Sequence, residues 1–270
     1  RLAGAALQCC QAVVIFFQFR SSTCKLRHRL VPHGVSLIIG PTALHRLFPN
    51  SRKVMGLAKF FVRLAKQLPI DLAQATMNER TKGKLIALDL VPRLPEAERG
   101  SQTALDVGCR AGNQTRWLEN IGYMVTSVDV EKTFDKCIIV DADKRLPFDD
   151  NSFDLVWCSE VIEHLRDPEF SANEIRRVLK DGGMMVLTTP NSYFWLMRPF
   201  HLVGLKPVKL QNDDHKQFFS ARDICRLFPT ADIFGYFPYM LIKLKIRCCL
   251  GPLTPTFVIC ERQPAAGAVA

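Results

Sequence analysis

Two features of the sequence, a glycine-containing turn and a later aspartate, could together bind a ribose. The turn Gly108-Cys-Arg-Ala-Gly112 follows the apolar run Thr103–Val107 and precedes a helix that Asn113 is expected to cap. A strand–turn–helix unit of this kind lets a ligand approach the backbone closely. Asp129 ends the next apolar run, where its carboxylate can accept hydrogen bonds from both ribose hydroxyls. The turn lacks the dinucleotide spacing Gly-x-Gly-x-x-Gly, so the sequence favours a ligand that carries a ribose without needing a diphosphate cradle.

Three titratable residues that follow a later apolar run could remove a proton from a reacting group. They are Glu160, Glu163 and His164. If this segment is helical, Glu160 faces the same way as Glu163 or His164, at steps of three or four residues. We expect His164 to be the principal general base, because an imidazole titrates near working pH.

Alternating apolar runs and helical patterns must position these residues. The runs cover residues 103–107, 123–128, 137–140, 153–157 and 184–188, and helices are predicted after Asn113 and from Asp167-Pro168 onward. Strands that alternate with helices in this way predict a parallel, doubly wound α/β sheet. Ligands of such sheets bind at the carboxyl ends of the strands, which is where the residues singled out above lie.

Four stretches, in this order and at this spacing, resemble the motif series of class I S-adenosylmethionine-dependent methyltransferases. They are Ala104-Leu-Asp-Val-Gly-Cys-Arg-Ala-Gly112, Ser127-Val-Asp129, Asp141-Ala-Asp-Lys-Arg-Leu-Pro-Phe148 and Asn151-Ser-Phe-Asp-Leu-Val-Trp-Cys-Ser-Glu-Val-Ile-Glu-His-Leu165, and residues 179–187 continue the series. The resemblance is close over residues 100–190 and loose over 210–262. It implies a Rossmann-like sheet of seven strands, S-adenosylmethionine as cofactor, and methylation as the activity of a cytoplasmic transferase.

The resemblance also implies roles for individual residues. Those that would contact the cofactor are Asp106, Gly108 and Gly112 around its methionine part, Asp129 at the ribose, Asp141 and Ala142 at the adenine, and Cys158, Ser159 and Glu160 facing the sulfonium. The family usually has glycine where this chain has Arg110. The Arg110 side chain must therefore point away from the cofactor, or the turn must shift.

The arrangement Glu160-x-x-Glu163-His164 also resembles segments of ubiquinone-biosynthesis O-methyltransferases and of small-RNA 3′-terminal methyltransferases. In those families it can hold a divalent ion together with a further histidine, and His215 is the corresponding candidate here. The same pattern lines the pocket or braces loops in metal-free members of the superfamily. We therefore expect no metal, and the candidate ligands, should one bind, are Glu160, Glu163, His164 and His215.

The acceptor is expected to be a small, lipid-linked or glycan-type metabolite that is methylated on oxygen. Residues 190–219 are rich in aromatic and polar side chains and could form a lid over the acceptor, or a surface helix that packs through its aromatics. A non-catalytic scaffold with the cofactor fold is the first alternative, favoured by Arg110. An RNA methyltransferase is the second, but the sequence has no RNA-binding module or aromatic–basic platform.

The charge of the chain is distributed unevenly. The 270 residues carry a formal net charge of +10, yet residues 1–70 contain eleven basic side chains and no acidic one, whereas acidic residues outnumber basic ones over 101–170. The positive charge therefore lies mostly outside the segment that resembles a methyltransferase. A polyanionic substrate, which the total charge would suggest, is disfavoured.

We expect residues 1–50 to be a poorly ordered basic leader, in which organellar targeting is not excluded. Residues 51–99 are expected to be a helical extension and linker, residues 100–262 the methyltransferase domain and residues 263–270 a disordered tail. The basic amphipathic segment 52–72 could contact an anionic membrane or pack on its own domain. The apolar stretch 233–250 could likewise approach a membrane or form a buried pair of strands. The cysteines fit reduced thiols.

Overall fold

The computed structural model describes residues 81–198, 201, 214–237 and 244–265. The expected leader over 1–50 and the amphipathic segment 52–72 lie outside the described residues, as does most of the expected tail. Within the described ranges, the helices are too short or too polar to cross a membrane.

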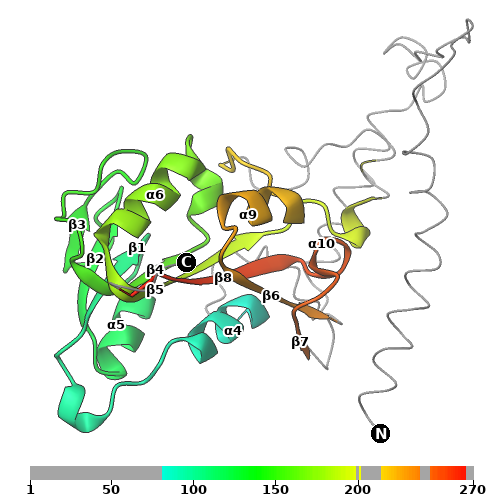
Figure 1. Cartoon of the computed structure of the whole chain (residues 1–270). Coiled ribbons are helices and arrows are strands. Elements are labelled where there is room, and N and C mark those ends of the chain that lie inside the picture. Colours follow the sequence, from blue (N-terminus) through cyan, green and yellow to red (C-terminus); the bar gives the residue numbers. More distant parts are fainter. Residues whose placement is uncertain (1–80, 199–200, 202–213, 238–243, 266–270) are drawn as a thin grey trace, which may run out of the picture. The chain divides into compact units, whose positions relative to one another are not determined.

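An eight-stranded sheet with the order β3-β2-β1-β4-β5-β8-β6-β7 forms the centre of the described chain (Figure 1). Its strands are β1 Thr103–Val107, β2 Met124–Asp129, β3 Cys137–Ile139, β4 Phe153–Ser159, β5 Leu179–Pro190, β6 Asp232–Phe237, β7 Leu244–Ile246 and β8 Thr256–Arg262. Strands β1 to β5 are parallel, and β8 runs antiparallel between β5 and β6. The predicted doubly wound Rossmann-like sheet is thus confirmed. The short strand β7, which pairs antiparallel with β6 at the edge, brings the strand number from the expected seven to eight.

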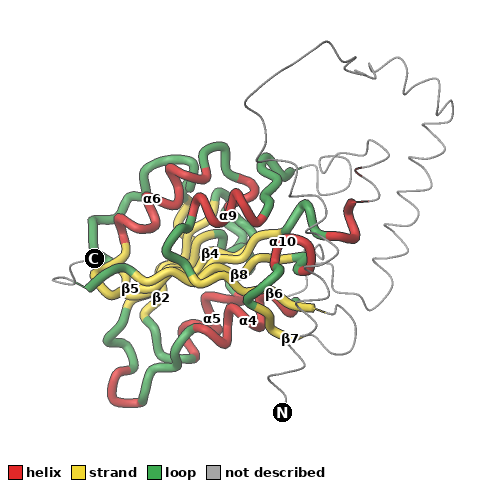
Figure 2. Tube along the Cα trace, turned by 45° about the vertical axis from the view of Figure 1, so that its right-hand side comes forward, coloured by secondary structure: helices red, strands yellow, loops and turns green. Residues whose placement is uncertain are grey.

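Helices cover both faces of the sheet and make a three-layer structure (Figure 2). The helices are α4 Lys82–Leu90, α5 Asn113–Asn120, α6 Pro168–Val178, α9 Ala221–Leu227 and α10 Leu250–Leu253. Helices α4 and α5 lie on one face, and α6 and α9 lie on the other. Each face buries its own apolar cluster, with Trp157 and Tyr236 in the first and Val156 and Phe257 in the second. This double burial fixes the strands whose ends form the site described below.

Local side-chain hydrogen bonds explain where two of the helices begin. The Asp167 carboxylate accepts a hydrogen bond from the Phe170 N–H at 2.9 Å, and Pro168 takes the first helical position of α6, as predicted. Helix α9 starts with a reciprocal capping box between Ser220 and Asp223. The expected cap at Asn113 is wrong by one residue. Gly112 caps α5 with a left-handed backbone, and Asn113 is the first helical residue.

Helix α4 corrects the expected boundary near residue 100. Its Ile86 and Ala87 are buried in the same cluster as residues of β4, β5 and β8, and Val91 and Leu94 continue that cluster. Residues 81–94 are therefore packed against the sheet and do not form a linker. The packing of α4 could not be predicted from the sequence, because its apolar residues are distributed around the helix and form no single stripe.

The two late segments with alternative expectations are partly described. In the stretch 233–250, the described residues form most of β6, the short strand β7 and the start of α10, and β6 is largely buried whereas β7 is exposed. In the expected lid 190–219, Phe194 and Met197 are buried in the core, while 199–200 and 202–213 lie outside the described residues.

Candidate active site

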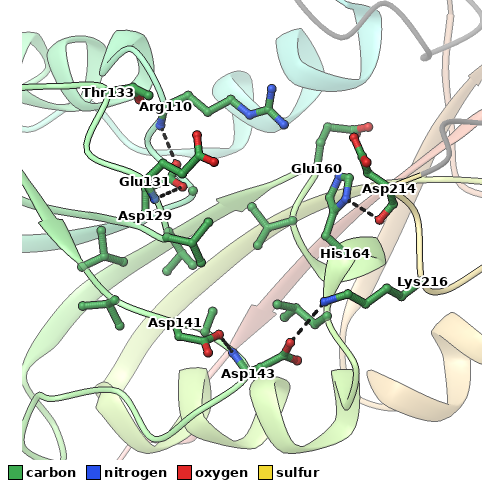
Figure 3. Close-up of a pocket in the computed structure, with 18 of the residues that line it drawn as sticks. Arg110, Asp129, Glu131, Thr133, Asp141, Asp143, Glu160, His164, Asp214 and Lys216 are labelled. Atoms are coloured by element: carbon green, nitrogen blue, oxygen red, sulfur yellow. Dashed lines mark hydrogen bonds and ion pairs between the residues drawn. The ribbon is translucent and has the colours of Figure 1, made fainter.

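A cavity of about 700 Å³ opens at the carboxyl ends of the parallel strands (Figure 3). Its lining comes from the ends of β1 and β2, from the segments that follow β1, β2, β3 and β4, and from residues 214 and 216. Of the residues predicted from the sequence, the cavity is lined by Gly108, Asp129, Asp141, Ala142, Glu160 and His164. The topology therefore brings residues from four separate predicted segments to one place.

The turn after β1 can be built only with glycine at its two ends. Gly108 and Gly112 have φ values of +79° and +73°, which glycine adopts without strain. A Cβ at Gly108 would lie 2.3 Å from Val161 Cγ2, and one at Gly112 would lie 2.7 Å from the Phe134 ring. The backbone of this turn therefore lies close to Val161 and Phe134, and Gly108 also lines the cavity.

Asp129 ties the loops that follow β1 and β2 together. Its Oδ2 accepts a hydrogen bond from the Arg110 N–H at 2.9 Å, and its Oδ1 accepts one from the Glu131 N–H at 3.4 Å. The carboxylate is itself part of the cavity wall. It is therefore placed by the backbone to receive hydroxyl donors from a ligand.

The opposite end of the cavity is also acidic. Asp141 Oδ1 accepts the Asp143 N–H at 3.0 Å, and this hydrogen bond is the main reason why the pKa of Asp141 is lowered. Asp143 Oδ2 in turn forms an ion pair with Lys216 Nζ at 3.4 Å. Because both ends of the cavity carry carboxylates, the cavity would favour a positively charged ligand.

Comparison with known proteins shows similarity of this chain to methyltransferases. Residues 105–187 match the family described as Methyltransferase domain. The chain is 34% identical over 102 residues to a 2-methyl-6-phytyl-1,4-hydroquinone methyltransferase of Synechocystis sp., which covers 33% of this chain and 32% of that protein. It is 23% identical over 150 residues to a ubiquinone biosynthesis O-methyltransferase of Aeromonas salmonicida, covering 48% of this chain and 61% of that protein. A crystal structure of an S-adenosylmethionine-dependent methyltransferase from Mesorhizobium loti shares the fold, with a TM-score of 0.51 and 14% identity over 67% of this chain and 97% of that one.

Residues 105–187 are thus a methyltransferase domain, and the described chain has the fold of S-adenosylmethionine-dependent methyltransferases. The chain spans between about a third and three fifths of the length of the curated relatives that it matches. The residues present fit S-adenosylmethionine by their chemistry, since the Gly108 backbone and the strand-end carboxylate of Asp129 both line the cavity.

Asp106 of the methyltransferase domain lies beneath the turn and does not line the cavity. Its side chain is 1% exposed, and its Oδ2 accepts a hydrogen bond from Thr115 Oγ1 at 2.6 Å. Burial raises the pKa of Asp106 to about 6, although the Thr115 hydroxyl acts in the opposite direction. Asp106 therefore joins β1 to α5 and supports the turn from behind.

Stability of the methyltransferase domain should depend on pH through Asp106. The folded-state pKa of about 6 lies above the ordinary value of 3.8, so the contribution of Asp106 is fully present below pH 3.8 and is lost as the pH rises through 6. We expect wild type to lose about 2 kcal/mol of unfolding free energy relative to Asp106→Asn between pH 4 and pH 7. Urea denaturation of both proteins across this range measures the difference. Parallel stability curves would contradict it.

Three further residues expected near the cofactor do not line the cavity. Cys158 is buried in the cluster under α6, and burial raises the pKa of its thiol. Ser159 shares a hydrogen bond of 2.8 Å with the Thr188 hydroxyl on the neighbouring strand. Gly112 faces Phe134. The alternation of a strand turns Cys158 away from the site, and sequence motifs do not show this.

Glu160 and His164 line the cavity, but they do not share a helix. Glu160 has a left-handed backbone with φ of +57°, and the segment after it forms only the 3-10 turn Ile162–His164 (η2). Thr188 Oγ1 donates a hydrogen bond to Glu160 Oε1 at 3.0 Å. His164 Nδ1 lies 3.1 Å from the Asp214 carbonyl oxygen. A carbonyl only accepts, so Nδ1 carries the proton and Nε2 carries the lone pair.

Glu163 does not line the cavity, and its buried carboxyl lies beside two half-buried imidazoles. Its ligand oxygen and ring nitrogens of His164 and His215 all lie within 4.8 Å of one another. Thr189 Oγ1 donates to Glu163 Oε2 at 3.0 Å, and burial raises the pKa of Glu163 well above its usual range. Burial also lowers the pKa of His215 to about 4. Burial therefore disfavours the charged form of both side chains.

The group formed by Glu163, His164 and His215 could hold a divalent metal. Among the described residues, Glu163 Oε1 and His215 Nδ1 are buried and have no hydrogen-bond partner. One carboxylate and two imidazoles form a common ligand set for a transition metal. Glu160, the fourth candidate ligand from the sequence, lies outside the group.

The sequence analysis missed four charged residues of the cavity. They are Glu131, Asp143, Asp214 and Lys216. The first two each follow a predicted strand-end aspartate by two residues, so their spacing could have indicated them. Asp214 and Lys216 reach the cavity because the backbone N–H groups of Lys216 and Gln217 both bond to the Glu163 carbonyl at 2.9 Å. Such a distant contact leaves no local signal.

Proposed function

We propose that this chain is a methyltransferase that transfers a methyl group from S-adenosylmethionine to an oxygen of a small, lipid-linked or glycan-type metabolite. The observation that carries the proposal is the cavity itself, in which Asp129 and His164 line one space at the strand ends. Two relatives are named as hydroquinone and ubiquinone-biosynthesis methyltransferases, which supports a small-molecule acceptor. The basic residues before position 71 would suit a lipid-linked acceptor at an anionic membrane.

The residues of the cavity would divide the work between binding and proton removal. When bound, the cofactor supplies a methyl carbon that is already activated for displacement. Asp129 would receive the ribose hydroxyls, and Asp141 with Ala142 would border the adenine. His164 would accept the acceptor's proton at Nε2, since the Asp214 carbonyl holds its other nitrogen in the protonated form. The chain therefore acts mainly by positioning the two reactants and taking up one proton.

Methyl-labelled S-adenosylmethionine, incubated with the protein and fractionated cell extract, tests the proposal. Label is expected in the lipid or small-molecule fraction. Label in RNA would support an RNA methyltransferase instead. Tight binding of S-adenosylhomocysteine without label in any fraction would support a non-catalytic scaffold.

A second candidate, methyl transfer assisted by a divalent metal, is favoured by the two unpartnered buried atoms of Glu163 and His215. A metal bound by Glu163, His164 and His215 would supply a Lewis acid for the acceptor oxygen. The same assay separates the candidates. With His164 as a simple base, the rate is equal with and without EDTA, whereas the metal-assisted reaction stops in EDTA and returns with Mg²⁺ or Mn²⁺.

A further inference from the structure

Arg110 occupies a strained backbone position in the wall of the cavity. Its φ is +43°, although the family usually has glycine at this position. Among the described residues, four that are not glycine have positive φ, and two of these, Arg110 and Glu160, line this cavity. Strain of this kind persists where the surrounding structure enforces it, and it concentrates at functional sites. Arg110 is exposed and lines the cavity, and Figure 3 shows its side chain running toward the end of the cavity where Glu160 lies.

The guanidinium of Arg110 is the uncommitted positive charge of an otherwise acidic wall. Among the described residues that line the cavity, one further Lys or Arg side chain, that of Lys216, is present, and it is paired with Asp143 at 3.4 Å. Arg110 uses its backbone N–H to bond Asp129, and its guanidinium forms no ion pair or hydrogen bond with any described residue. A bound anion could therefore take this charge without displacing a protein partner.

The position of Arg110 in the cavity determines which part of a bound ligand its side chain would contact. Figure 3 places Arg110 at the end of the cavity where Glu160 also lies, with Asp141 and Asp143 at the other end. Since Asp141 would border the adenine and Asp129 the ribose, the Arg110 end receives the amino-acid part of the cofactor. That part is a zwitterion, and Arg110 and Glu160 present opposite charges to it.

We propose that Arg110 binds the carboxylate of the cofactor's methionine moiety through its guanidinium. This inference rests on the proposed function, because it requires that the cavity binds S-adenosylmethionine. A planar guanidinium can form two parallel hydrogen bonds with a carboxylate, which a lysine ammonium cannot reproduce. Arg110 thereby supplies a side-chain contact that a glycine at the same position could not make.

Calorimetric binding of two ligands tests the role of Arg110. The ligands are S-adenosylhomocysteine and its decarboxylated counterpart, in which hydrogen replaces the carboxylate. Wild type should prefer the first ligand by about tenfold. Arg110→Gly should abolish this preference by weakening S-adenosylhomocysteine alone, and Arg110→Lys should retain only part of it. Arg145→Gly, which removes an exposed arginine outside the cavity, is the matched control and should leave the preference unchanged.

The outcomes separate this inference from the function on which it rests. Glycine adopts positive φ without strain, so the melting temperature of Arg110→Gly should not fall below that of wild type. An equal preference in wild type and Arg110→Gly would overturn the inference and leave the proposed function standing. Unchanged S-adenosylhomocysteine binding with a raised KM for the acceptor would overturn it in favour of an acidic acceptor. A wild-type protein that binds neither ligand would overturn both proposals.

Discussion

Replacing Asp129 with alanine is expected to weaken S-adenosylhomocysteine binding by about 10²- to 10⁴-fold. Two charge-assisted hydrogen bonds to the ribose hydroxyls would be lost, and each contributes about 1.5–3 kcal/mol. The variant also removes the acceptor of the Arg110 and Glu131 N–H groups, so the loops after β1 and β2 lose their common anchor. Isothermal titration calorimetry measures the affinity directly.

Two comparisons make the Asp129 result specific. Asp135→Ala removes an exposed aspartate from the same loop region without touching the cavity, and its affinity should equal that of wild type. Methylthioadenosine, which keeps the ribose but lacks the amino-acid part, should lose as much affinity to Asp129→Ala as S-adenosylhomocysteine does. If Asp129→Ala bound both ligands normally, the ribose would have to be held elsewhere.

Replacing His164 with alanine is expected to lower kcat by about 10²- to 10⁴-fold, the usual contribution of a positioned general base. Binding of S-adenosylhomocysteine should change little, because His164 would face the acceptor. The hydrogen bond of its Nδ1 to the Asp214 carbonyl fixes the ring so that Nε2 is available. Parallel measurement of kcat and of the dissociation constant separates the two effects.

His164→Gln provides the control for His164. Its side-chain amide can replace the hydrogen bond to the Asp214 carbonyl but cannot accept the acceptor's proton, so its kcat should be as low as that of His164→Ala. A variant with normal kcat would exclude His164 as the base and would leave Glu160 as the remaining titratable candidate in the cavity.

The sequence predicted those parts of the fold and site that depend on local patterns. The strand ends at Asp129 and Asp141 could be found because an apolar run, a polar end residue and the following turn are adjacent in the chain. Gly108 could be found because the tight turn has no room for a side chain. These short-range rules are sufficient to place six of the predicted residues around one cavity.

Other parts required tertiary structure. Helical periodicity put Glu160 and Glu163 on one face, but the left-handed backbone at Glu160 and the 3-10 turn after it send them in different directions. Similarly, the T-shaped contact between His164 and His215, with ring centroids 4.8 Å apart, joins two segments that no local rule connects. Burial of α4 was missed for the same reason, since the surface that covers it is formed by late strands.

The insertion of β8 between β5 and β6 determines when this domain can complete its folding. Helix α4 is the first described element of the chain, and it packs on β8, with Gly83 lying against Thr256. On the ribosome, α4 and β5 must therefore wait with exposed apolar surface until residues 256–262 have emerged. Contacts between such distant segments form slowly, and the waiting chain is open to aggregation. A nascent chain that stops before Thr256 lacks the strand that joins the two halves of its sheet, and it is a natural client for chaperones.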